Sequence, residues 1–383
     1  MRVNIAVPGK FHYFNYLEFI AKAGVLSEFY YSHKLNGTLP EGVHSQHAHN
    51  CFLKEYLTFF HLKFMRGLQF NRAVTFYQDL WENEVLKKWA DCEIFHLLNH
   101  GAARRLCRRA KQAGSIVVGE PVNSHPANMF KILTDEHERL GIPYYREMPA
   151  TFSRMIEEAE SFDYVLSPSQ FVTKSYAARG FDASRIFTLP FGVDLNAFES
   201  RNQEKKKFRV IYVAQITPRK GHIDLLNAWS MMKLPTLEAE LIFVGHIDPV
   251  MKPILKKFEG TYTYAGTVPR SRLVELYNAS SVFVMPSLEE GCSYAPLEAM
   301  ACGLPVILTE NTGSGELVDH GKEGFIIPIR RPDLIADYLT QLYDHAGMRT
   351  AMALAAVHRA KEGFGWNSYA VHILSMYNKI MRK

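Results

Sequence analysis

Residues 289–318 read EEGCSYAPLEAMACGLPVILTENTGSGELV, and this stretch decides how the C-terminal half of the chain folds. The apolar run at 282–287 precedes it and a second run, at 305–310, lies inside it; both are predicted as buried strands. Between them, Pro296 suits the first turn of a helix and Gly303 suits its C-terminal end. The stretch is therefore expected to form a strand, a turn, a helix and a second strand, which is one unit of a parallel α/β sheet.

The same alternation of apolar, β-branched runs with helical periodicity extends along both halves of the chain. It is the pattern of parallel strands joined by crossover helices. The expected strands are 1–7, 92–98, 115–120, 163–169 and 185–191, then 208–214, 240–245, 262–266, 282–287, 305–310 and 324–328. A chain of 383 residues is longer than one core usually grows, so we predict an α/β protein of two doubly wound domains. The ligand cleft should lie between the carboxyl ends of their sheets.

Two further segments complete this organisation. The charged run RNQEKKK at 201–207 is interpreted as a solvated linker between the domains. The tail at 364–383 has apolar residues at helical spacing, which predicts a closing helix with one buried face.

Composition and charge narrow the class of protein. The apolar content of 47% and charged content of 22% are those of an ordinary folded protein. The five cysteines form no CxxC pair, which suits free thiols in a reducing compartment such as the cytoplasm. We expect neither a signal peptide nor a membrane span. The net charge of +5 favours anionic partners, but no nucleic-acid-binding signature accompanies it.

Two carboxylates in the opening stretch suggest a ligand site. Glu290 is expected in the loop above the carboxyl end of its strand and Glu298 in the first helical turn, both facing the cleft. Unpaired backbone N–H groups and the positive dipole end of a helix N-terminus are suited to a phosphate. A carboxylate one turn into the helix can accept hydrogen bonds from the two hydroxyls of a ribose.

Glu290 and Glu298 resemble the E-x7-E signature of retaining glycosyltransferases of the GT-B fold, family four (glycosyl transferases group 1). Seven residues separate the two glutamates, and the run EAMACGLPVI begins at Glu298. An isolated match of this kind would more simply indicate a solvated helix face. Four further segments are similar to the linker strand, first C-terminal strand and loop, glycine-rich loop and crossing segment of that family. They are LPFGVDLNAF at 189–198, IYVAQITPRKG at 211–221, ENTGSGELV at 310–318 and FGW at 364–366. In the first of these, Phe191 replaces the usual asparagine.

The resemblance implies a GT-B fold of two Rossmann-like domains facing across a cleft. It assigns 1–198 to the acceptor-side domain, 199–365 to the nucleotide-sugar domain and 366–383 to a helix that crosses back. It implies transfer of a hexose-type sugar from a nucleotide diphospho-sugar to a glycan, lipid-linked or small-molecule acceptor, with the anomeric configuration retained. Neither a cofactor nor a metal is expected, and the aspartate pair of metal-dependent transferases is missing.

The resemblance also carries roles over to individual residues. The expected catalytic residues are Lys220 at the leaving diphosphate, Glu290 near the transferred sugar and His125 lining the cleft. Glu298 is expected to bind the ribose. The other expected donor-binding residues are Arg219, Gln215, Gly291, Cys292, Ser293, Thr267 and Gly9. Gly313, Ser314 and Gly315 should flank the phosphates, with Glu316 capping the helix that follows.

Several departures from the family pattern keep a second function open. Gln215 occupies the position of an arginine in most members, and Gly291-Cys292-Ser293 replaces the commoner Gly-Phe-Gly. The alternative is a catalytically degenerate GT-B protein that binds nucleotide or glycan as a partner subunit. Other reactions of this fold, phosphorolysis and sugar-nucleotide epimerisation, lack their motifs here.

The segment at 51–78 interleaves aromatic residues with Lys54, Lys63, Arg66 and Arg72, and a second basic cluster follows at 101–111. We expect a helix with its aromatic residues in the core and its basic groups in water. The alternative is peripheral contact with anionic lipid at the inner face of the membrane.

Overall fold

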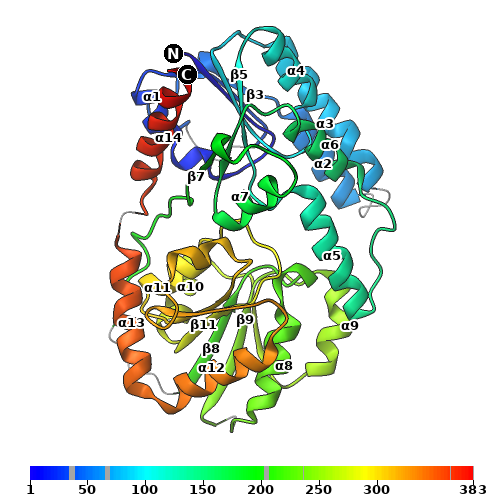
Figure 1. Cartoon of the computed structure of the whole chain (residues 1–383). Coiled ribbons are helices and arrows are strands. Elements are labelled where there is room, and N and C mark those ends of the chain that lie inside the picture. Colours follow the sequence, from blue (N-terminus) through cyan, green and yellow to red (C-terminus); the bar gives the residue numbers. More distant parts are fainter. Residues whose placement is uncertain (34–38, 65–69, 202–206, 236, 363, 383) are drawn as a thin grey trace.

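The computed structural model describes residues 1–33, 39–64, 70–201, 207–235, 237–362 and 364–382, and only the backbone of residues 70–72. Within these residues the chain forms two α/β domains, one above the other in Figure 1. Most of the charged run that we interpreted as a linker, 202–206, lies outside the described residues, as does Arg66.

The N-terminal domain is built on a seven-stranded sheet in the order β3-β2-β1-β4-β5-β6-β7. Its strands are β1 Val3–Val7, β2 Leu26–Tyr31, β3 Ala48–Asn50, β4 Ile94–Leu98, β5 Ile116–Glu120, β6 Tyr164–Ser167 and β7 Ile186–Thr188. Every pairing is parallel. The central strands β1 and β4 are buried along their whole length, as expected of a parallel sheet covered on both faces.

The C-terminal domain repeats the arrangement with six parallel strands in the order β10-β9-β8-β11-β12-β13. They are β8 Phe208–Val213, β9 Ala239–Val244, β10 Thr263–Gly266, β11 Val282–Met285, β12 Val306–Thr309 and β13 Gly324–Ile327. In both sheets the chain order reverses beside the first strand, β1 or β8, which is where ligands bind in doubly wound folds. The GT-B fold class and every strand expected from the sequence are confirmed; β2 and β3 were not predicted.

Helices cover both sheets. They are α1 Leu17–Lys22, α2 Leu53–Phe64, α3 Phe70–Lys87, α4 Arg104–Gln112, α5 Pro126–Leu140, α6 Ala150–Ala159, α7 Gln170–Ala177, α8 His222–Met232, α9 Lys252–Leu255, α10 Arg270–Asn278, α11 Ala295–Ala301, α12 Pro332–Asp344, α13 Ala346–Ala360 and α14 Trp366–Met381. The opening stretch folds as expected: Pro296 lies in the first turn of α11, and Gly303 follows that helix with φ of 79°.

The last helix, α14, packs against the N-terminal domain, beside the chain's N-terminus (Figure 1). Its Tyr369 and Ile373 belong to the same buried cluster as Val3 and Ile5 of β1. The Tyr369 hydroxyl also donates a hydrogen bond of 2.6 Å to Glu120, a fully buried carboxylate at the end of β5. The two ends of the chain therefore share one core.

Helix α5 begins in the N-terminal domain and runs down beside the C-terminal domain (Figure 1). Its last residue, Leu140, packs against the C-terminal core. Arg139 of α5 forms an ion pair of 3.0 Å with the buried Asp224 of α8. The domains are thus joined on this side by packing and by charge.

Helix α2 contradicts the expectation that the aromatic residues of this segment lie in the core. Tyr56, Phe59, Phe60 and Phe64 are all exposed, whereas the basic Lys54 is buried. The expectation was wrong because it inferred burial from hydrophobicity alone. Among the described residues, no helix is both long and apolar enough to pass through a bilayer.

Candidate active site

The candidate site is a cluster of four charged side chains between the carboxyl ends of β8 and β11. Arg219 and Lys220 end a short 3-10 helix, Pro218–Lys220, after β8, and Glu289 and Glu290 follow β11. Lys220 forms an ion pair with Glu290, and each side chain is only about a tenth exposed. The structure therefore brings together two residues that lie seventy positions apart and that we expected to be catalytic.

Arg219 binds both glutamates. Its guanidinium donates to the Glu289 backbone oxygen at 2.7 Å and to the Glu289 carboxylate at 3.0 Å, and lies 3.5 Å from Glu290. Burial, and then the adjacent charge of Arg219, lower the pKa of Lys220, whereas the charge of Glu289 raises it. Two cations held side by side in a poorly solvated place form a site for an anion. In this structure the carboxylates of Glu289 and Glu290 balance their charge.

Glu289 is a site residue that the sequence analysis missed. It is fully buried, and its carboxylate accepts hydrogen bonds from the Ser124 backbone N–H at 2.8 Å and from the Asn123 side chain at 2.9 Å. Both donors belong to the loop after β5, so Glu289 joins the two domains while it orients Arg219. Its position directly before the first glutamate of the signature was the one available signal.

The turn after Glu290 packs tightly against the opposite domain. A Cβ atom on Gly291 would lie 2.1 Å from the Val122 carbonyl oxygen, so only glycine fits there. Cys292 is buried, which raises the pKa of its thiol to about 11. The Ser293 backbone N–H donates to the Ser314 hydroxyl at 2.7 Å. That amide, expected to be open to a phosphate, already has a protein partner.

The glycine-rich loop folds as a 3-10 helix, Gly313–Leu317, and corrects the expectation for Glu316. Glu316 does not cap the helix that follows. Its carboxylate accepts hydrogen bonds from the backbone N–H groups of Gln170 and Phe171, which open α7 in the other domain. The expectation took the next helix along the chain as the partner of Glu316. The actual partner is α7, which only the tertiary fold brings close to it.

Glu298 lies in the first turn of α11 and faces a neighbouring cavity of about 300 Å³. The other residues that line this cavity are Asn15, Val193, Asp194, Arg270, Tyr294 and Trp366. Burial raises the pKa of Glu298 to about 7, opposed by the charge of Arg270 and a weak 3.4 Å hydrogen bond from Tyr277. A half-buried carboxylate with so few partners has capacity for ligand hydroxyl groups.

His125 does not join this cluster through its side chain. It caps the N-terminus of α5, where its Nδ1 accepts from the Ala127 backbone N–H, and it lines a separate cavity of about 600 Å³ in the N-terminal domain. Burial lowers the pKa of its imidazole to about 4, so the ring is neutral at ordinary pH. The preceding residue, Ser124, does reach Glu289.

The remaining residues that we expected to bind the donor lie outside the charged cluster. Gln215 and Thr267 are exposed, after β8 and β10 respectively, and Gly9 is buried in the loop after β1. Among the described residues, no three His, Cys, Asp or Glu side chains gather where they could hold a metal ion. Metal independence and the individual residue roles stay predictions.

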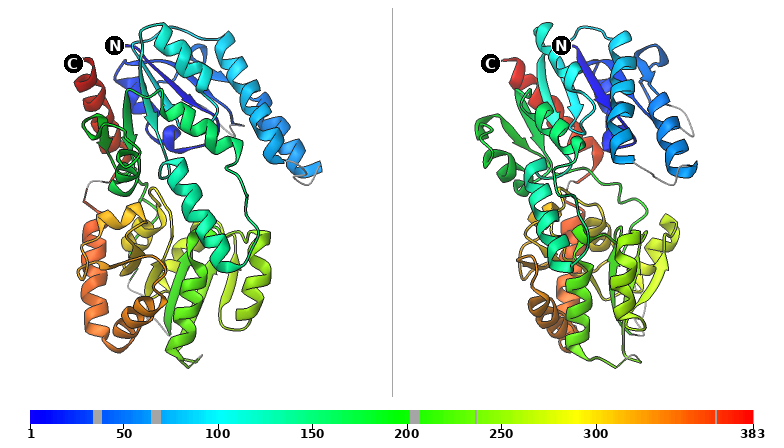
Figure 2. Two further views of the ribbon diagram at one scale, coloured as in Figure 1. Left: turned by 45° about the vertical axis from the view of Figure 1, so that its right-hand side comes forward. Right: turned by 90° about the vertical axis from the view of Figure 1, so that its right-hand side faces the viewer.

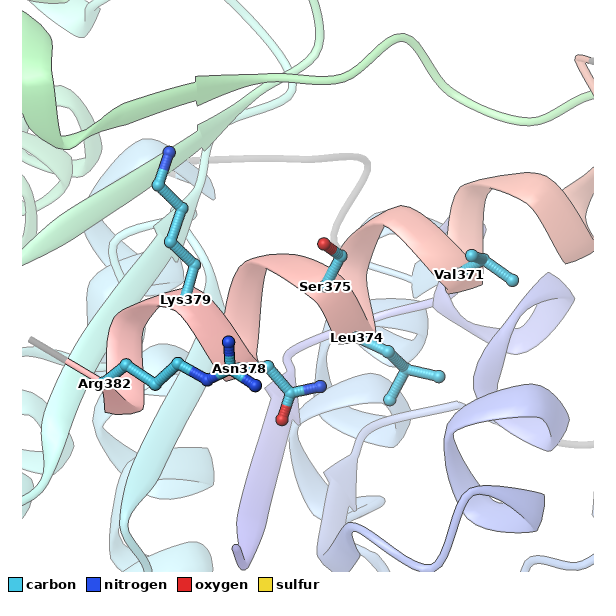
Figure 3. A pocket seen from close by; sticks show the side chains of 6 residues that line it. All are labelled: Val371, Leu374, Ser375, Asn378, Lys379 and Arg382. Carbon is cyan, nitrogen blue, oxygen red and sulfur yellow. The ribbon is translucent and has the colours of Figure 1, made fainter.

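A further cavity, of about 650 Å³, lies away from this chemistry. It is formed along one side of α14, and all six labelled residues in Figure 3 come from that helix. The ammonium of Lys379 there lies 5.5 Å from the centre of the Phe187 ring. None of these side chains belongs to the charged cluster.

Comparison with known proteins agrees with this arrangement. Residues 194–359 match the family described as glycosyl transferases group 1. The chain is 28% identical over 218 residues to D-inositol 3-phosphate glycosyltransferase of Paenarthrobacter aurescens, covering 52% of this chain and 53% of the relative. It is 25% identical over 248 residues to the GDP-mannose-dependent alpha-(1-6)-phosphatidylinositol monomannoside mannosyltransferase of Mycobacterium tuberculosis, covering 59% and 64%.

The fold comparison extends further than the sequence comparison. The crystal structure of HepE from Anabaena in complex with UDP-glucose superposes with a TM-score of 0.67 over 99% of this chain and 100% of HepE, at 14% identity. In sequence, by contrast, the chain spans about half the length of the first curated relatives it matches. Residues 194–359 thus match the family model of glycosyl transferases group 1, and the chain as a whole has the two-domain GT-B fold.

Proposed function

We propose that this protein is a metal-independent, retaining glycosyltransferase. It transfers a sugar from a nucleotide diphospho-sugar to a hydroxyl group of a glycan, lipid-linked or small-molecule acceptor, on the cytoplasmic side of a membrane. The observation that carries the proposal is the cluster of Arg219, Lys220, Glu289 and Glu290 at the facing carboxyl ends of two parallel sheets. The match of residues 194–359 to the family glycosyl transferases group 1 supports sugar transfer as the reaction class.

The cluster suits a reaction in which a diphosphate leaves. As the bond between the sugar and the diphosphate breaks, negative charge grows on the phosphate oxygens, and prepositioned cations stabilise that charge most. Arg219 and Lys220 are held in place by their carboxylate partners, so little reorganisation is needed when a diphosphate arrives. Glu290, released from Lys220, would then be available to the hydroxyl groups of the transferred sugar.

Glu298 suits the nucleoside part of the donor. Its carboxylate can accept hydrogen bonds from the two ribose hydroxyls within the 300 Å³ cavity, beside Arg270 and Trp366. The nucleobase stays open, since one relative is named for GDP-mannose and HepE was crystallised with UDP-glucose. Thr267 and Gln215 are exposed near the strand ends and remain candidates for contacts with the donor.

A thermal-shift panel of UDP, GDP, ADP and their common sugar conjugates tests donor binding, because a ligand that binds only the native state raises its stability. We expect one nucleotide to raise the melting temperature of the wild type and of Glu310→Ala, whose exposed side chain lies near the site, but not of Glu298→Ala. No shift with any nucleotide would contradict the proposal.

Turnover needs a separate measurement. The purified chain should hydrolyse the selected donor slowly without an acceptor, in the presence of EDTA, and NMR of the transferred sugar should show the anomeric configuration of the donor. Nucleotide binding without any hydrolysis or transfer would favour the alternative, a catalytically degenerate partner subunit. In that case reverting Gln215→Arg is the first variant to make.

A further inference from the structure

Helix α2 has its polar and apolar faces reversed relative to a helix that packs on a core. Its exposed side carries Leu53, Tyr56, Phe60 and Phe64, at spacings of three, four and four residues, which form one continuous stripe. Phe59 and Leu62 are exposed next to it, at 59% and 51%. A water-exposed helix face of this composition is unfavourable in a free protein, so this face is expected to have a partner.

The inward side of α2 is polar, and it fixes the orientation of the helix. The buried Lys54 donates a 2.9 Å hydrogen bond to the Pro8 backbone oxygen. The buried His61 lies 2.8 Å from the hydroxyl of Tyr77 in α3. Rotating α2 to bury its aromatic stripe would expose both groups and break both contacts. The contacts of Lys54 and His61 therefore keep the aromatic stripe of α2 on its outward side.

Exposed aromatic residues are concentrated here: among the described side chains, the other exposed aromatic residues are Tyr145 and Tyr264. All the exposed phenylalanines lie on α2 and α3: Phe59, Phe60, Phe64 and Phe76. The two helices stand out at the side of the N-terminal domain in both views of Figure 2. The stripe thus lies on helices that project from the domain, which suits contact with a broad plane better than binding of a small ligand.

The charge of this surface points to an anionic plane. The ammonium of Lys63 lies 5.4 Å from the ring centres of both Phe59 and Phe64, so the cation lies among the aromatic rings. The acidic side chain of α2, Glu55, is turned away and binds Ser32 and Lys54. Aromatic rings with an interspersed lysine and no outward carboxylate match the headgroup layer of an anionic bilayer.

We propose that the outward stripe of α2, namely Leu53, Tyr56, Phe60 and Phe64 with Lys63 beside it, docks on an anionic lipid bilayer. Because Lys54 binds Pro8 in the loop after β1, the docked helix begins at the cleft edge of the N-terminal sheet. Lipid headgroups would then lie next to the cleft. This rests on the proposed function, and it selects a lipid-linked acceptor from the three acceptor classes left open there.

Vesicle flotation tests docking without any donor. The wild type should float with phosphatidylcholine vesicles that contain phosphatidylglycerol and much less with pure phosphatidylcholine. The triple variant Tyr56→Ser/Phe60→Ser/Phe64→Ser should bind the anionic vesicles on the order of tenfold more weakly or less still. Lys63→Glu should weaken binding mainly at low salt. The matched control is Leu354→Ser, which removes an equally exposed apolar side chain from α13 and should bind like the wild type.

Two further readouts separate docking from misfolding and from self-association. The triple variant should keep the wild-type response to nucleotide in the thermal-shift panel, which shows that the fold and the donor site persist. A tryptophan at position 64, Phe64→Trp, should be quenched by brominated anionic lipid. Wild type that fails to float, or a triple variant that floats equally well, would overturn docking on lipid. A concentration-dependent dimer that the triple variant abolishes, without flotation of the wild type, would overturn it in favour of a second copy of this chain.

Discussion

The carboxylate of Glu316 accepts a hydrogen bond of 2.7 Å from the backbone N–H of Gln170, the first residue of α7 in the opposite domain. A second bond, of 2.8 Å, comes from Phe171, and the Ser169 hydroxyl accepts from Val172. Three N–H groups that the first turn of a helix leaves unpaired are therefore satisfied, two of them by the other domain. At this place one side chain both joins the two domains and caps α7.

Replacing that side chain should loosen the contact between the domains. Because Glu316 is exposed, we expect Glu316→Ala to lower the free energy of unfolding by only about 0.5 to 1 kcal/mol. The radius of gyration in small-angle scattering should rise more clearly, since α7 no longer holds the glycine-rich loop. Glu310→Ala, an exposed glutamate of the same strand-to-loop region, serves as the control. Equal scattering curves for the two variants would show that the cap does not hold the domains together.

Gly291→Ala tests the close approach of the two domains from the other side. The added methyl group would lie 2.1 Å from the Val122 carbonyl oxygen, a backbone atom that cannot move alone. We expect the cleft to open by a small amount and kcat/KM for transfer to fall on the order of 10²-fold, because Glu289, which orients Arg219, no longer meets Ser124 correctly. The control is Gly347→Ala, where a Cβ atom meets nothing within 4 Å. Unchanged kcat/KM in Gly291→Ala would mean that this contact forms no part of the reactive state.

Strands and helix starts were predictable because they depend on local hydrophobic periodicity and on Pro or Gly residues at the ends of the elements. The strand, turn and helix around Pro296 and Gly303 folded as expected. Strand β3 was missed because its sequence, Ala-His-Asn, contains no apolar run, whereas the equally short β7 lies in one. Contacts between domains were also missed: nothing local in the sequence distinguishes Glu289, which binds Ser124, from Glu290, which binds Lys220. The family resemblance identified Glu290 and Glu298 as one signature. The outward orientation of the aromatic residues of α2, by contrast, became evident only from the structure.

The ion pair of Lys220 with Glu290 predicts a stability effect that a paired substitution should reverse. Both side chains are nearly buried, so Lys220→Ala leaves the Glu290 carboxylate with only its longer, 3.5 Å contact to Arg219 and should cost about 3 kcal/mol of unfolding free energy. Lys220→Ala/Glu290→Gln should recover most of that loss in denaturant titrations. Donor turnover should stay at least about 10²-fold below wild type in both variants, because Arg219 is then the one cation of the cluster left to face the leaving diphosphate. Recovery of turnover together with stability would contradict the catalytic role of Lys220.

Glu298 predicts how nucleotide affinity depends on pH. Its folded-state pKa of about 7 lies above its ordinary value of 4.5, so the native carboxyl keeps a proton that the unfolded chain has lost. Between those values the native state binds more protons, and the contribution of Glu298 to stability therefore declines as pH rises through that window. An ionised carboxylate accepts ribose hydroxyls better, so nucleotide binding should release this proton and strengthen from about pH 6 to about pH 8, by up to about tenfold.

Calorimetric titration of the preferred nucleotide at several pH values measures this dependence. Glu298→Gln keeps the shape of the side chain but has no proton to release, so its affinity should be lower and should retain only the pH dependence of the nucleotide phosphate itself. The difference between the two curves isolates Glu298. Parallel curves for wild type and variant would show that Glu298 is already ionised in the free protein, or that the nucleoside binds elsewhere.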